Sequence, residues 1–254
     1  MKVKGAEKRR IARITEEGCL EFDDAVAVER RLRISVNGQE VLRLYCSPVK
    51  IRELVVGLFM TEGVIRGNWC AARMTVKYGR DILVDIPAEG EVSLEGGTIT
   101  SGCLGGITFG RTFEDAAAGE GIEIERESLR DLFTKFQRMS KLYELTGCIH
   151  NAAVSNIKRI ITHAEDIGRH NAVDKVIGHC ILKNITLKDK LMHVSGRLSS
   201  EMASKCARWK VPIVVSRAAP TSLAIDIAEK SGITMIGFMR ASRFNIYTHP
   251  YRII

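Results

Sequence analysis

The sequence predicts an α/β protein, α+β overall, with a smaller β-rich N-terminal region and a larger C-terminal region in which strands and helices alternate. In the first half, short apolar runs flank Asn37-Gly38, a dipeptide typical of a two-residue β-hairpin. In the second half, short apolar runs alternate with helical patterns, as in βαβ units with a mostly parallel sheet. We expect the two regions to be 1–120 and 121–254.

Composition places the chain among ordinary folded proteins and narrows its partners. Of its 254 residues, 45% are hydrophobic and 27% are charged, so disorder explains none of its features. A net charge of +8 at pH 7 favours an anionic partner, which leaves nucleic acid, a membrane surface and a phosphorylated ligand open. The seven cysteines are irregularly spaced and no apolar signal sequence is recognised, which fits a reducing compartment better than a set of disulfides. No apolar run reaches the ~20 residues of a membrane helix. We therefore expect a cytoplasmic protein with no membrane partner.

The N-terminal half is predicted to consist mainly of β-structure around one helix. Residues 1–10 are basic and are expected to form a solvated tail. From Ile11 to Leu44 the short apolar runs predict antiparallel strands. Ser47-Pro48 is then expected to open a helix as its N-cap and first helical residue, with one apolar face made of Ile51, Leu54, Val55, Leu58 and Phe59.

Further strands and a connecting segment follow this helix. Met74–Ile86 and Val92–Leu94 are predicted strands, the first of them broken at Tyr78-Gly79-Arg80-Asp81. Phe109–Gly121 is rich in glycine, alanine and acidic residues and is predicted to link the two regions. The segment between these strands and the linker is the one that we expect to carry the chemistry.

A single cysteine stands among glycines in Ile99–Ile107, and the sequence there predicts a reactive thiol. The neighbours of Cys103 lack a Cβ atom and favour an exposed loop: Gly102, Gly105 and Gly106. A nearby positive charge stabilises a nucleophilic thiolate, and Arg111 is the closest one in sequence. The alternative is a small buried side chain at the end of a strand.

Helices and strands alternate in the second half. Ser128, with Asp131 three residues later, resembles a capping box that opens a long helix, whose apolar stripe consists of Leu129, Leu132, Phe133, Phe136, Met139, Leu142 and Tyr143. The elements after it are predicted as strand 157–162, helix 171–183, strand 191–195, helix 199–209, strand 211–216, helix 221–231 and strand 233–238. This alternation is typical of parallel strands joined by helices.

Four turns are expected at the carboxyl edge of this sheet, where ligands of such folds bind. Each carries at least one arginine, and the first three precede a helix N-terminus with free N–H donors: 166–171, 195–200, 216–222 and 237–243. Guanidinium groups that converge on one edge favour a diphosphate or a nucleotide over a lone carboxylate. We therefore predict an anion site there. The alternatives for single residues are structural, with Asn171 capping its helix and Arg197 pairing with Glu201.

Other patterns argue against a metal or a known nucleotide motif. The chain has no Cys-x-x-Cys, so Cys148-Ile149-His150 is not expected to bind zinc, and no structural metal is expected. His170 follows Arg169 at a helix start, which favours a neutral, hydrogen-bonding imidazole. No Gly-x-Gly-x-x-Gly or Walker A sequence occurs. The remaining cysteines are expected in or near the core: Cys19, Cys46, Cys70, Cys148, Cys180 and Cys206.

Five stretches of the chain share one resemblance. They are Thr61-Glu62-Gly63, Asp166–Lys175, Ser195-Gly196-Arg197, Pro220-Thr221-Ser222 and Asn245–His249. Together they resemble the FdhD family, the formate dehydrogenase accessory sulfurtransferases, over nearly the whole chain. The resemblance implies a homodimer with a cytidine deaminase-like C-terminal α/β domain. It also implies a sulfur carrier, which takes sulfur from a cysteine desulfurase as a persulfide and delivers it to the molybdenum cofactor, bis-molybdopterin guanine dinucleotide, before this enters formate dehydrogenase.

Carried over to this sequence, the resemblance makes Cys103 the catalytic, persulfide-bearing residue. It places the guanine dinucleotide against Phe238, Met239, Arg240, Ala241, Ser242 and Arg243, with Arg169, His170, Arg197 and Arg217 nearby. One position departs from the family pattern, because many members have Cys-x-x-Cys in the loop, whereas residue 106 is glycine here. A persulfide carrier needs one nucleophilic sulfur, so Gly106 is compatible with sulfur transfer but argues against a transfer between two loop cysteines.

Three other functions compete with sulfur transfer. A non-catalytic chaperone that binds and escorts the molybdenum cofactor would make Cys103 a bystander. A nucleotide deaminase would need His-x-Glu and Pro-Cys-x-x-Cys around zinc, whereas this chain has His150-Asn151-Ala152 and no Pro-Cys-x-x-Cys. Nucleic-acid binding is disfavoured by an aromatic content of 6%, so no nucleic-acid partner is expected.

Overall fold

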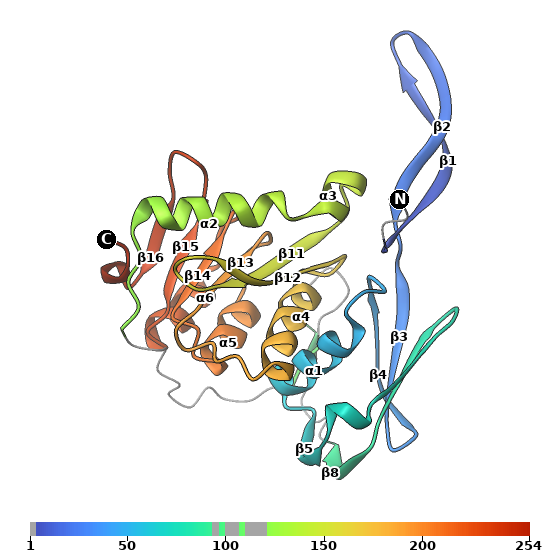
Figure 1. The fold of residues 1–254 in the computed structure, drawn as a ribbon, viewed down its shortest axis with the longest axis horizontal. Helices are drawn as coiled ribbons and strands as arrows, with labels where there is room; N and C mark the ends of the chain where they lie inside the picture. The colour runs from blue at the N-terminus through green and yellow to red at the C-terminus, as the bar shows by residue number, and fades with distance from the viewer. Residues whose placement is uncertain (1–3, 93–96, 100–106, 110–120) are drawn as a thin grey trace.

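Two main β-sheets, one from each half of the chain, organise the structure (Figure 1). The computed structural model describes residues 4–92, 97–99, 107–109 and 121–254. The predicted boundary near residue 120 and most of the predicted linker lie outside the described residues, as does Cys103. Among the helices that are described, none is both long enough and apolar enough to cross a membrane.

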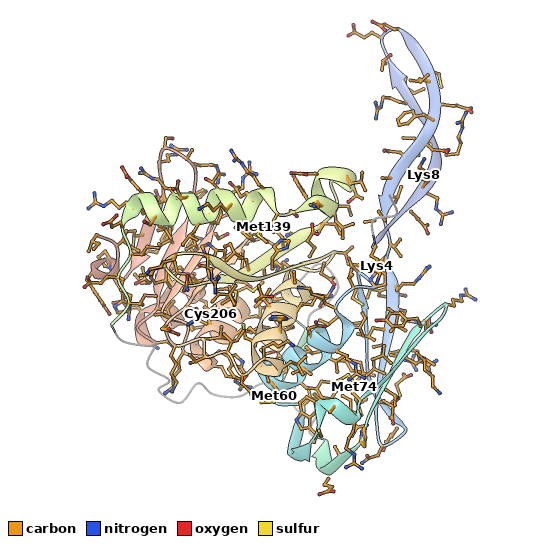
Figure 2. All side chains as sticks on the ribbon, in the orientation of Figure 1. Lys4, Lys8, Met60, Met74, Met139 and Cys206 are labelled. Atoms are coloured by element: carbon orange, nitrogen blue, oxygen red, sulfur yellow. The ribbon has the colours of Figure 1, made fainter. Side chains whose placement is uncertain are left out.

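The first two strands form a long hairpin that extends away from the rest of the chain (Figure 1). β1 (Ala6–Thr15) pairs with β2 (Gly18–Ala27) in one unbroken antiparallel register. The prediction of a solvated tail over residues 1–10 is therefore wrong for the part that lies in β1. Basic side chains of β1 find partners on β2, since Arg10 pairs with Glu21 at 3.4 Å and the Arg13 guanidinium lies 4.5 Å from the Phe22 ring centre. Side chains project from both faces of this hairpin, around Lys8 in Figure 2.

The N-terminal sheet has the strand order β4-β3-β7-β6. The predicted hairpin is confirmed, because Asn37 and Gly38, with φ of 50° and 80°, join β3 (Arg30–Val36) to β4 (Gln39–Cys46). The predicted break at residues 78–81 separates β6 (Thr75–Tyr78) from β7 (Ile82–Ile86), which pairs in parallel with β3. Helix α1 (Ile51–Glu62) packs on this sheet through a core that includes Leu54, Phe59 and Ile34.

Helix α1 begins three residues later than the sequence predicts. The residue before it is Lys50, in the left-handed conformation with φ of 54°. Ser47 does not cap the helix, because its backbone N–H donates to the Asp166 carboxylate and its hydroxyl accepts from the Ile167 N–H. A partner in the second half of the chain thus takes the residue that was expected to be the cap.

Short strands fill the rest of the N-terminal half. β5 (Ile65–Trp69) pairs with β8 (Ala88–Val92), and a 3₁₀ turn, η1, covers Ala71–Arg73. β9 (Gly97–Ile99) pairs with β10 (Ile107–Phe109), so an antiparallel pair flanks the segment that contains Cys103.

The predicted long helix is two helices, α2 (Arg126–Arg138) and α3 (Lys141–Thr146). The chain turns at Ser140, whose hydroxyl donates to the Glu165 carboxylate at 2.8 Å, as does the Leu142 N–H at 3.0 Å. The N-cap is Glu125 rather than Ser128, so the capping-box prediction is also wrong. The apolar stripe is continuous in sequence, but the contacts with Glu165 of β12 (Ile160–Asp166) end the first helix at this point.

The C-terminal sheet is mixed rather than mostly parallel, with the order β12-β11-β13-β14-β15-β16. Only β13, β14 and β15 pair in parallel, and the two antiparallel strands β11 and β16 were not predicted. The strands are β11 (His150–Ser155), β12 (Ile160–Asp166), β13 (Leu191–Val194), β14 (Ile213–Ser216), β15 (Thr234–Gly237) and β16 (Asn245–Thr248). A final 3₁₀ turn, η2, covers Pro250–Arg252.

Helices cover both faces of this sheet (Figure 1). One face packs on α4 (Arg169–Leu182), α5 (Ser200–Arg208) and α6 (Ser222–Lys230), close to the predicted ranges. The other face packs on α2, whose Phe133 and Phe136 lie against Ala153, Leu191 and Val215. Alternate strand residues are therefore buried on opposite sides of the sheet.

The two halves of the chain meet where α1 crosses α4 at two glycines. A Cβ atom on Gly178 would overlap the Glu53 carbonyl oxygen and lie 2.7 Å from the Gly57 nitrogen. A Cβ atom on Gly57 would likewise overlap the Asp174 carbonyl oxygen. The helix backbones are in direct contact, which no residue with a side chain permits at these positions.

Two buried ion clusters lie on either side of this crossing. In the first, Lys175 Nζ donates to Asp166 at 2.5 Å and to the Ser47 carbonyl oxygen at 3.2 Å. In the second, Lys205 Nζ contacts Asp174 at 2.7 Å and Glu62 at 2.8 Å. Each cluster joins a residue of the N-terminal half to α4, so the two sheets are fixed relative to one another.

Gly178→Ala is expected to lower the free energy of unfolding by at least about 2 kcal/mol, because the new methyl group forces the two helix backbones apart. Urea unfolding followed by circular dichroism measures the change. The matched control is Gly79→Ala, where the nearest atom to the new Cβ is 3.5 Å away and little change is expected. Equal stability of the two variants would contradict the close crossing.

Lys205→Met is expected to lower the free energy of unfolding by roughly 3 kcal/mol, because it leaves the buried carboxylates of Asp174 and Glu62 without a cation. The control, Arg10→Met, removes an exposed ion pair with Glu21 and is expected to change stability by less than about 1 kcal/mol. The same unfolding measurement compares the two. A loss no greater than the control's would show that the cluster adds little to stability.

Candidate functional site

Four carboxyl ends of strands lie at one edge of the C-terminal sheet, as predicted, although the sheet is mixed. β11 is antiparallel to both β12 and β13, so these two strands run the same way, and β14 and β15 are parallel to β13. The turns after these four strands are the arginine-bearing turns of the sequence. The first residue of β11, His150, pairs with Asp166 and joins them at this edge.

Hydrogen bonds between neighbouring turns hold the edge together. The turn after β13 exchanges two backbone bonds with the turn after β14, from Leu198 to Ala219 and from Thr221 to Leu198, at 3.1 and 2.9 Å. The turn after β15 is tied to the same neighbour through the Phe238 N–H, which donates to the Ala218 carbonyl oxygen at 3.1 Å. The three turns form one backbone platform.

The structure brings the predicted residues of the first two turns together. Arg169 begins α4 and is only 5% exposed, and a Cβ atom on Gly196 would lie 3.1 Å from its Cδ. His170 lies against Glu201, with 3.8 Å between His170 Nε2 and Glu201 Oε2. The interaction with His170 is the main cause that lowers the pKa of the Glu201 carboxyl to about 2. No ion pair joins Arg197 to Glu201 among the described residues, and Arg197 is exposed.

Asn171 is not the N-cap of its helix. Gly168 occupies that position, and the Asn171 amide donates to Asp166 Oδ1 and to the Tyr45 carbonyl oxygen, both at 2.9 Å. Asn171 therefore has a structural role, but this role is to contact the buried ion cluster and β4 rather than to cap the helix.

The fourth predicted segment, Phe238–Arg243, is partly buried. Phe238 has a left-handed backbone, with φ of 51°, and is 39% exposed, whereas Met239 is 1% exposed and packs into the core under α2. Arg240 Nη1 donates to the carbonyl oxygens of Arg217 and Met239, at 2.7 and 2.8 Å. The last three residues of the segment are exposed: Ala241, Ser242 and Arg243.

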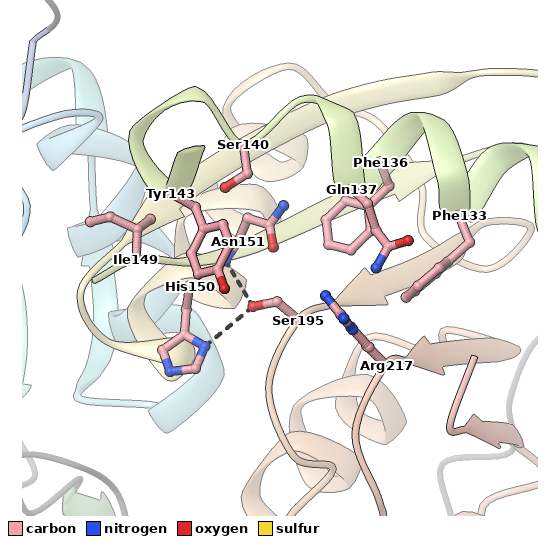
Figure 3. A pocket seen from close by; sticks show the side chains of 10 residues that line it. All are labelled: Phe133, Phe136, Gln137, Ser140, Tyr143, Ile149, His150, Asn151, Ser195 and Arg217. Carbon is pink, nitrogen blue, oxygen red and sulfur yellow. Dashed lines mark hydrogen bonds between the residues drawn. The ribbon is translucent and has the colours of Figure 1, made fainter. Parts of the chain in front are cut away.

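A cavity of about 300 Å³ opens beside this edge, between α2, α3 and the start of β11 (Figure 3). Its lining consists of Phe133, Phe136, Gln137, Ser140, Tyr143, Ile149, His150, Asn151, Ser195 and Arg217. Of the predicted site residues that the structure describes, Arg217 lines it. Ser195 belongs to the predicted turn 195–200. Other lining residues were not predicted to be part of a site, since Tyr143 and both phenylalanines belonged to an apolar stripe, and His150 and Asn151 to a strand that was not predicted.

Ser195 organises the polar side of the cavity. Its hydroxyl oxygen accepts from the Asn151 N–H at 3.0 Å and lies 3.2 Å from His150 Nδ1, as Figure 3 shows. Burial lowers the pKa of His150, and the positive charges of Arg169, His170 and Arg197 lower it further, against the opposing effect of Asp166. His150 is therefore a neutral imidazole at neutral pH, close to three of the predicted site residues.

The cysteines divide by position. Cys46, Cys180 and Cys206 are buried, as expected, and Figure 2 places Cys206 inside the C-terminal half. Cys19, Cys70 and Cys148 are exposed, so the prediction that they fill core space is wrong. Each stands at the surface because it follows or opens an exposed turn. The described residues contain no group of three or more His, Cys, Asp or Glu side chains arranged to hold a metal ion.

Comparison with known proteins agrees over nearly the whole chain. The profile of the FdhD/NarQ family matches residues 27–254. Sulfur carrier proteins FdhD of Bacillus licheniformis and Bacillus subtilis are each 38% identical to it, with 96% and 91% of both chains covered. A crystal structure of a putative formate dehydrogenase accessory protein from Desulfotalea psychrophila has 26% identity and a TM-score of 0.79, over 98% of this chain and 99% of that one. The chain belongs to the FdhD/NarQ family.

Proposed function

We propose that this chain is a sulfur carrier that serves formate dehydrogenase. It takes sulfur from a cysteine desulfurase as a persulfide on Cys103 and delivers it to bis-molybdopterin guanine dinucleotide before this cofactor enters the enzyme. It works as a homodimer in the cytoplasm. Support comes from relatives of the same length that are named sulfur carrier proteins. The structural observation that carries the proposal is the convergence of arginine-bearing turns on one sheet edge.

The loading step needs one thiolate. The Cys103 sulfur attacks the outer sulfur of the desulfurase persulfide, a new S–S bond forms, and the donor cysteine leaves as a thiolate. Electrons balance without an added oxidant, because one persulfide is exchanged for another. A second loop thiol would expel the bound sulfur as sulfide by closing a disulfide, so Gly106 leaves the persulfide on Cys103 intact.

The edge of the C-terminal sheet would bind the cofactor. Arg169, Arg197 and Arg217 come from three turns of this edge and Arg243 from the segment after β15, and Arg217 also lines the cavity. Guanidinium groups recognise phosphate oxygens in pairs, which suits the diphosphate groups of a dinucleotide. Phe238 to Arg243 would hold the guanine dinucleotide, with Arg240 also fixing the turn through its two backbone contacts.

A second candidate is an escort that binds the same cofactor without transferring sulfur. Gly106 favours it, because the second cysteine of many relatives is missing from the loop. A nucleotide deaminase is the third candidate, because a cytidine deaminase-like fold is proposed for the C-terminal region. This chain, however, lacks the motif residues that hold zinc in such enzymes.

The three cysteines that the structure shows to be buried are poor sulfur acceptors. Burial raises the pKa of Cys46 and of Cys206 to about 12, and that of Cys180 to about 11, so little thiolate forms at neutral pH. The exposed thiols of Cys19, Cys70 and Cys148 are the ones that could compete with Cys103.

Alkylation of the native protein with iodoacetamide at pH 8 is expected to modify Cys19, Cys70, Cys148 and Cys103 and to spare Cys46, Cys180 and Cys206. Peptide mass spectrometry locates the modified residues. Unfolding in guanidinium chloride should make all seven react, which is the control. Rapid labelling of Cys206 in the native protein would contradict its burial on the core-facing side of α5.

Incubation with a cysteine desulfurase and cysteine is expected to add one sulfur atom to the protein, located on Cys103 by peptide mass spectrometry. Cys103→Ala should lose this sulfur and the ability to activate formate dehydrogenase, while it still binds guanine nucleotide. Cys148→Ala is the matched control and should keep both activities.

The escort hypothesis predicts that Cys103→Ala still activates formate dehydrogenase. If Cys103→Ala still activates formate dehydrogenase, sulfur transfer is not the function and the escort replaces it. Arg243→Ala tests the proposed cofactor-binding residues, since it should weaken guanine-nucleotide binding about tenfold without changing sulfur loading. Unchanged nucleotide affinity would remove Arg243 from the site.

A further inference from the structure

A second cavity, of about 330 Å³, lies in the N-terminal half, where β5 and β8 pair. These strands are at the opposite end of that half from the β1–β2 hairpin (Figure 1). The lining of this cavity combines an aromatic ring, a thiol, a cation and an anion, which belong to Trp69, Cys70, Arg73 and Glu89. The proposed sulfur transfer uses none of these four residues.

The aromatic wall of the second cavity is fixed by its neighbours. The Asn37 side chain, which also lines the cavity, donates to the Ala88 carbonyl oxygen at 2.8 Å and accepts from the Ala88 N–H at 3.0 Å. Trp69 lies opposite Ala88 in the β5–β8 register and packs edge-on against Phe59 of α1, with ring centres 6.0 Å apart. This part of the cavity is therefore preformed, as is usual for small-molecule sites.

The thiol and the cation come from one short turn that is also held in place. Arg52 of α1 donates to the carbonyl oxygens of Ala71 and Met74, at 3.0 and 2.7 Å, and so fixes η1 at both of its ends. Cys70 precedes η1, and its carbonyl oxygen accepts from the Arg73 N–H at 3.0 Å. The Cys70 thiol is exposed, so a ligand in the cavity can reach it.

The two charges on the cavity are opposite in sign. Arg73 and Glu89 are both exposed, and no ion pair neutralises either of them within the part of the chain that the structure describes. A ligand with one carboxylate and one ammonium group complements such a pair of charges. A volume of about 330 Å³ is near the lower end of ligand pockets, which span roughly 300–1,000 Å³, so the ligand is small.

We propose that the second cavity binds a zwitterionic disulfide of the amino-acid class and retains one half of it on Cys70 as a mixed disulfide. The ligand carboxylate lies toward Arg73, its ammonium group toward Glu89, and its carbon chain against Trp69. The Cys70 thiol loses its proton to water and its sulfur attacks one sulfur of the ligand. A new S–S bond forms and the other half leaves as a thiolate, so the disulfide is itself the oxidant.

The mixed disulfide would make Cys70 a sensor of oxidised small thiols. Once it is formed, Cys70 can no longer compete for sulfur with Cys103, and reduction by a free thiol releases it again. Sulfur transfer through Cys103 takes no part in this binding, so either function can fail without the other.

Exchange of the full native chain with three disulfides tests the proposal. Cystine carries both charges, cystamine carries only ammonium groups, and 3,3′-dithiodipropionate carries only carboxylates. Peptide mass spectrometry of samples quenched over time gives the rate at each cysteine, with the exposed thiols of Cys19 and Cys148, outside this cavity, as internal controls. Cystine is expected to modify Cys70 about tenfold faster than either control, because each exposed charge contact contributes up to roughly fivefold. With the other two disulfides this advantage should be at least about threefold smaller.

Two variants remove the charges one at a time. Arg73→Gln and Glu89→Gln change exposed side chains, so both variants should fold. Each is expected to slow the modification of Cys70 by cystine about threefold. Arg80→Gln, which removes an exposed cation from the turn between β6 and β7, is the matched control and should have no effect.

Two results would overturn the proposal. In the first, cystine modifies Cys70 no faster than Cys19 and Cys148. In the second, the three disulfides give Cys70 the same advantage, since exposure of its thiol alone would then explain its reactivity.

Discussion

The contact between Gly57 and Gly178 is the constraint on which the rest of the structure depends. Because α1 and α4 touch backbone to backbone there, the N-terminal sheet lies close enough to the C-terminal sheet for Ser47 to reach Asp166 and for Glu62 to reach Lys205. Burying these charges is unfavourable unless they are paired, and the pairing is possible only at this separation. The turn that begins α4 is fixed as a result, and Arg169 and His170 with it.

The family-like run Asp166–Lys175 therefore combines two tasks in one segment. Asp166, Asp174 and Lys175 face the N-terminal half and are fully buried in the ion clusters. Arg169 and His170 face the sheet edge beside Gly196 and Glu201. Sequence reasoning predicted an anion-binding turn at 166–171 and a helix from 171, and it did not identify the buried ion clusters, because a pattern of residue types does not reveal which side of a helix meets a partner from another sheet.

Local signals predicted the elements whose stability is local. Asn37-Gly38 marked its hairpin, and the apolar periodicity of α5 and α6 gave their positions closely. Errors occurred where a distant group decides the outcome, as at Ser140, where Glu165 ends a helix that the apolar stripe would continue. The gathering of arginine-bearing turns at one edge was predictable from arginines after strands, and anion binding there stays a prediction. The cavity was not, because its aromatic wall comes from α2 and α3 and its floor from β11, which only the tertiary fold brings together.

The hydrogen bonds between turns have a consequence for how this edge can change over evolutionary time. They run through backbone atoms at Leu198, Ala218, Ala219 and Phe238, so they place no demand on most of the side chains that surround them. Substitutions at exposed positions such as Arg197 and Arg217 can then alter what is recognised without disturbing the shape that presents them. A scaffold of this kind separates the evolution of specificity from the maintenance of form, which lets one fold serve different cargoes.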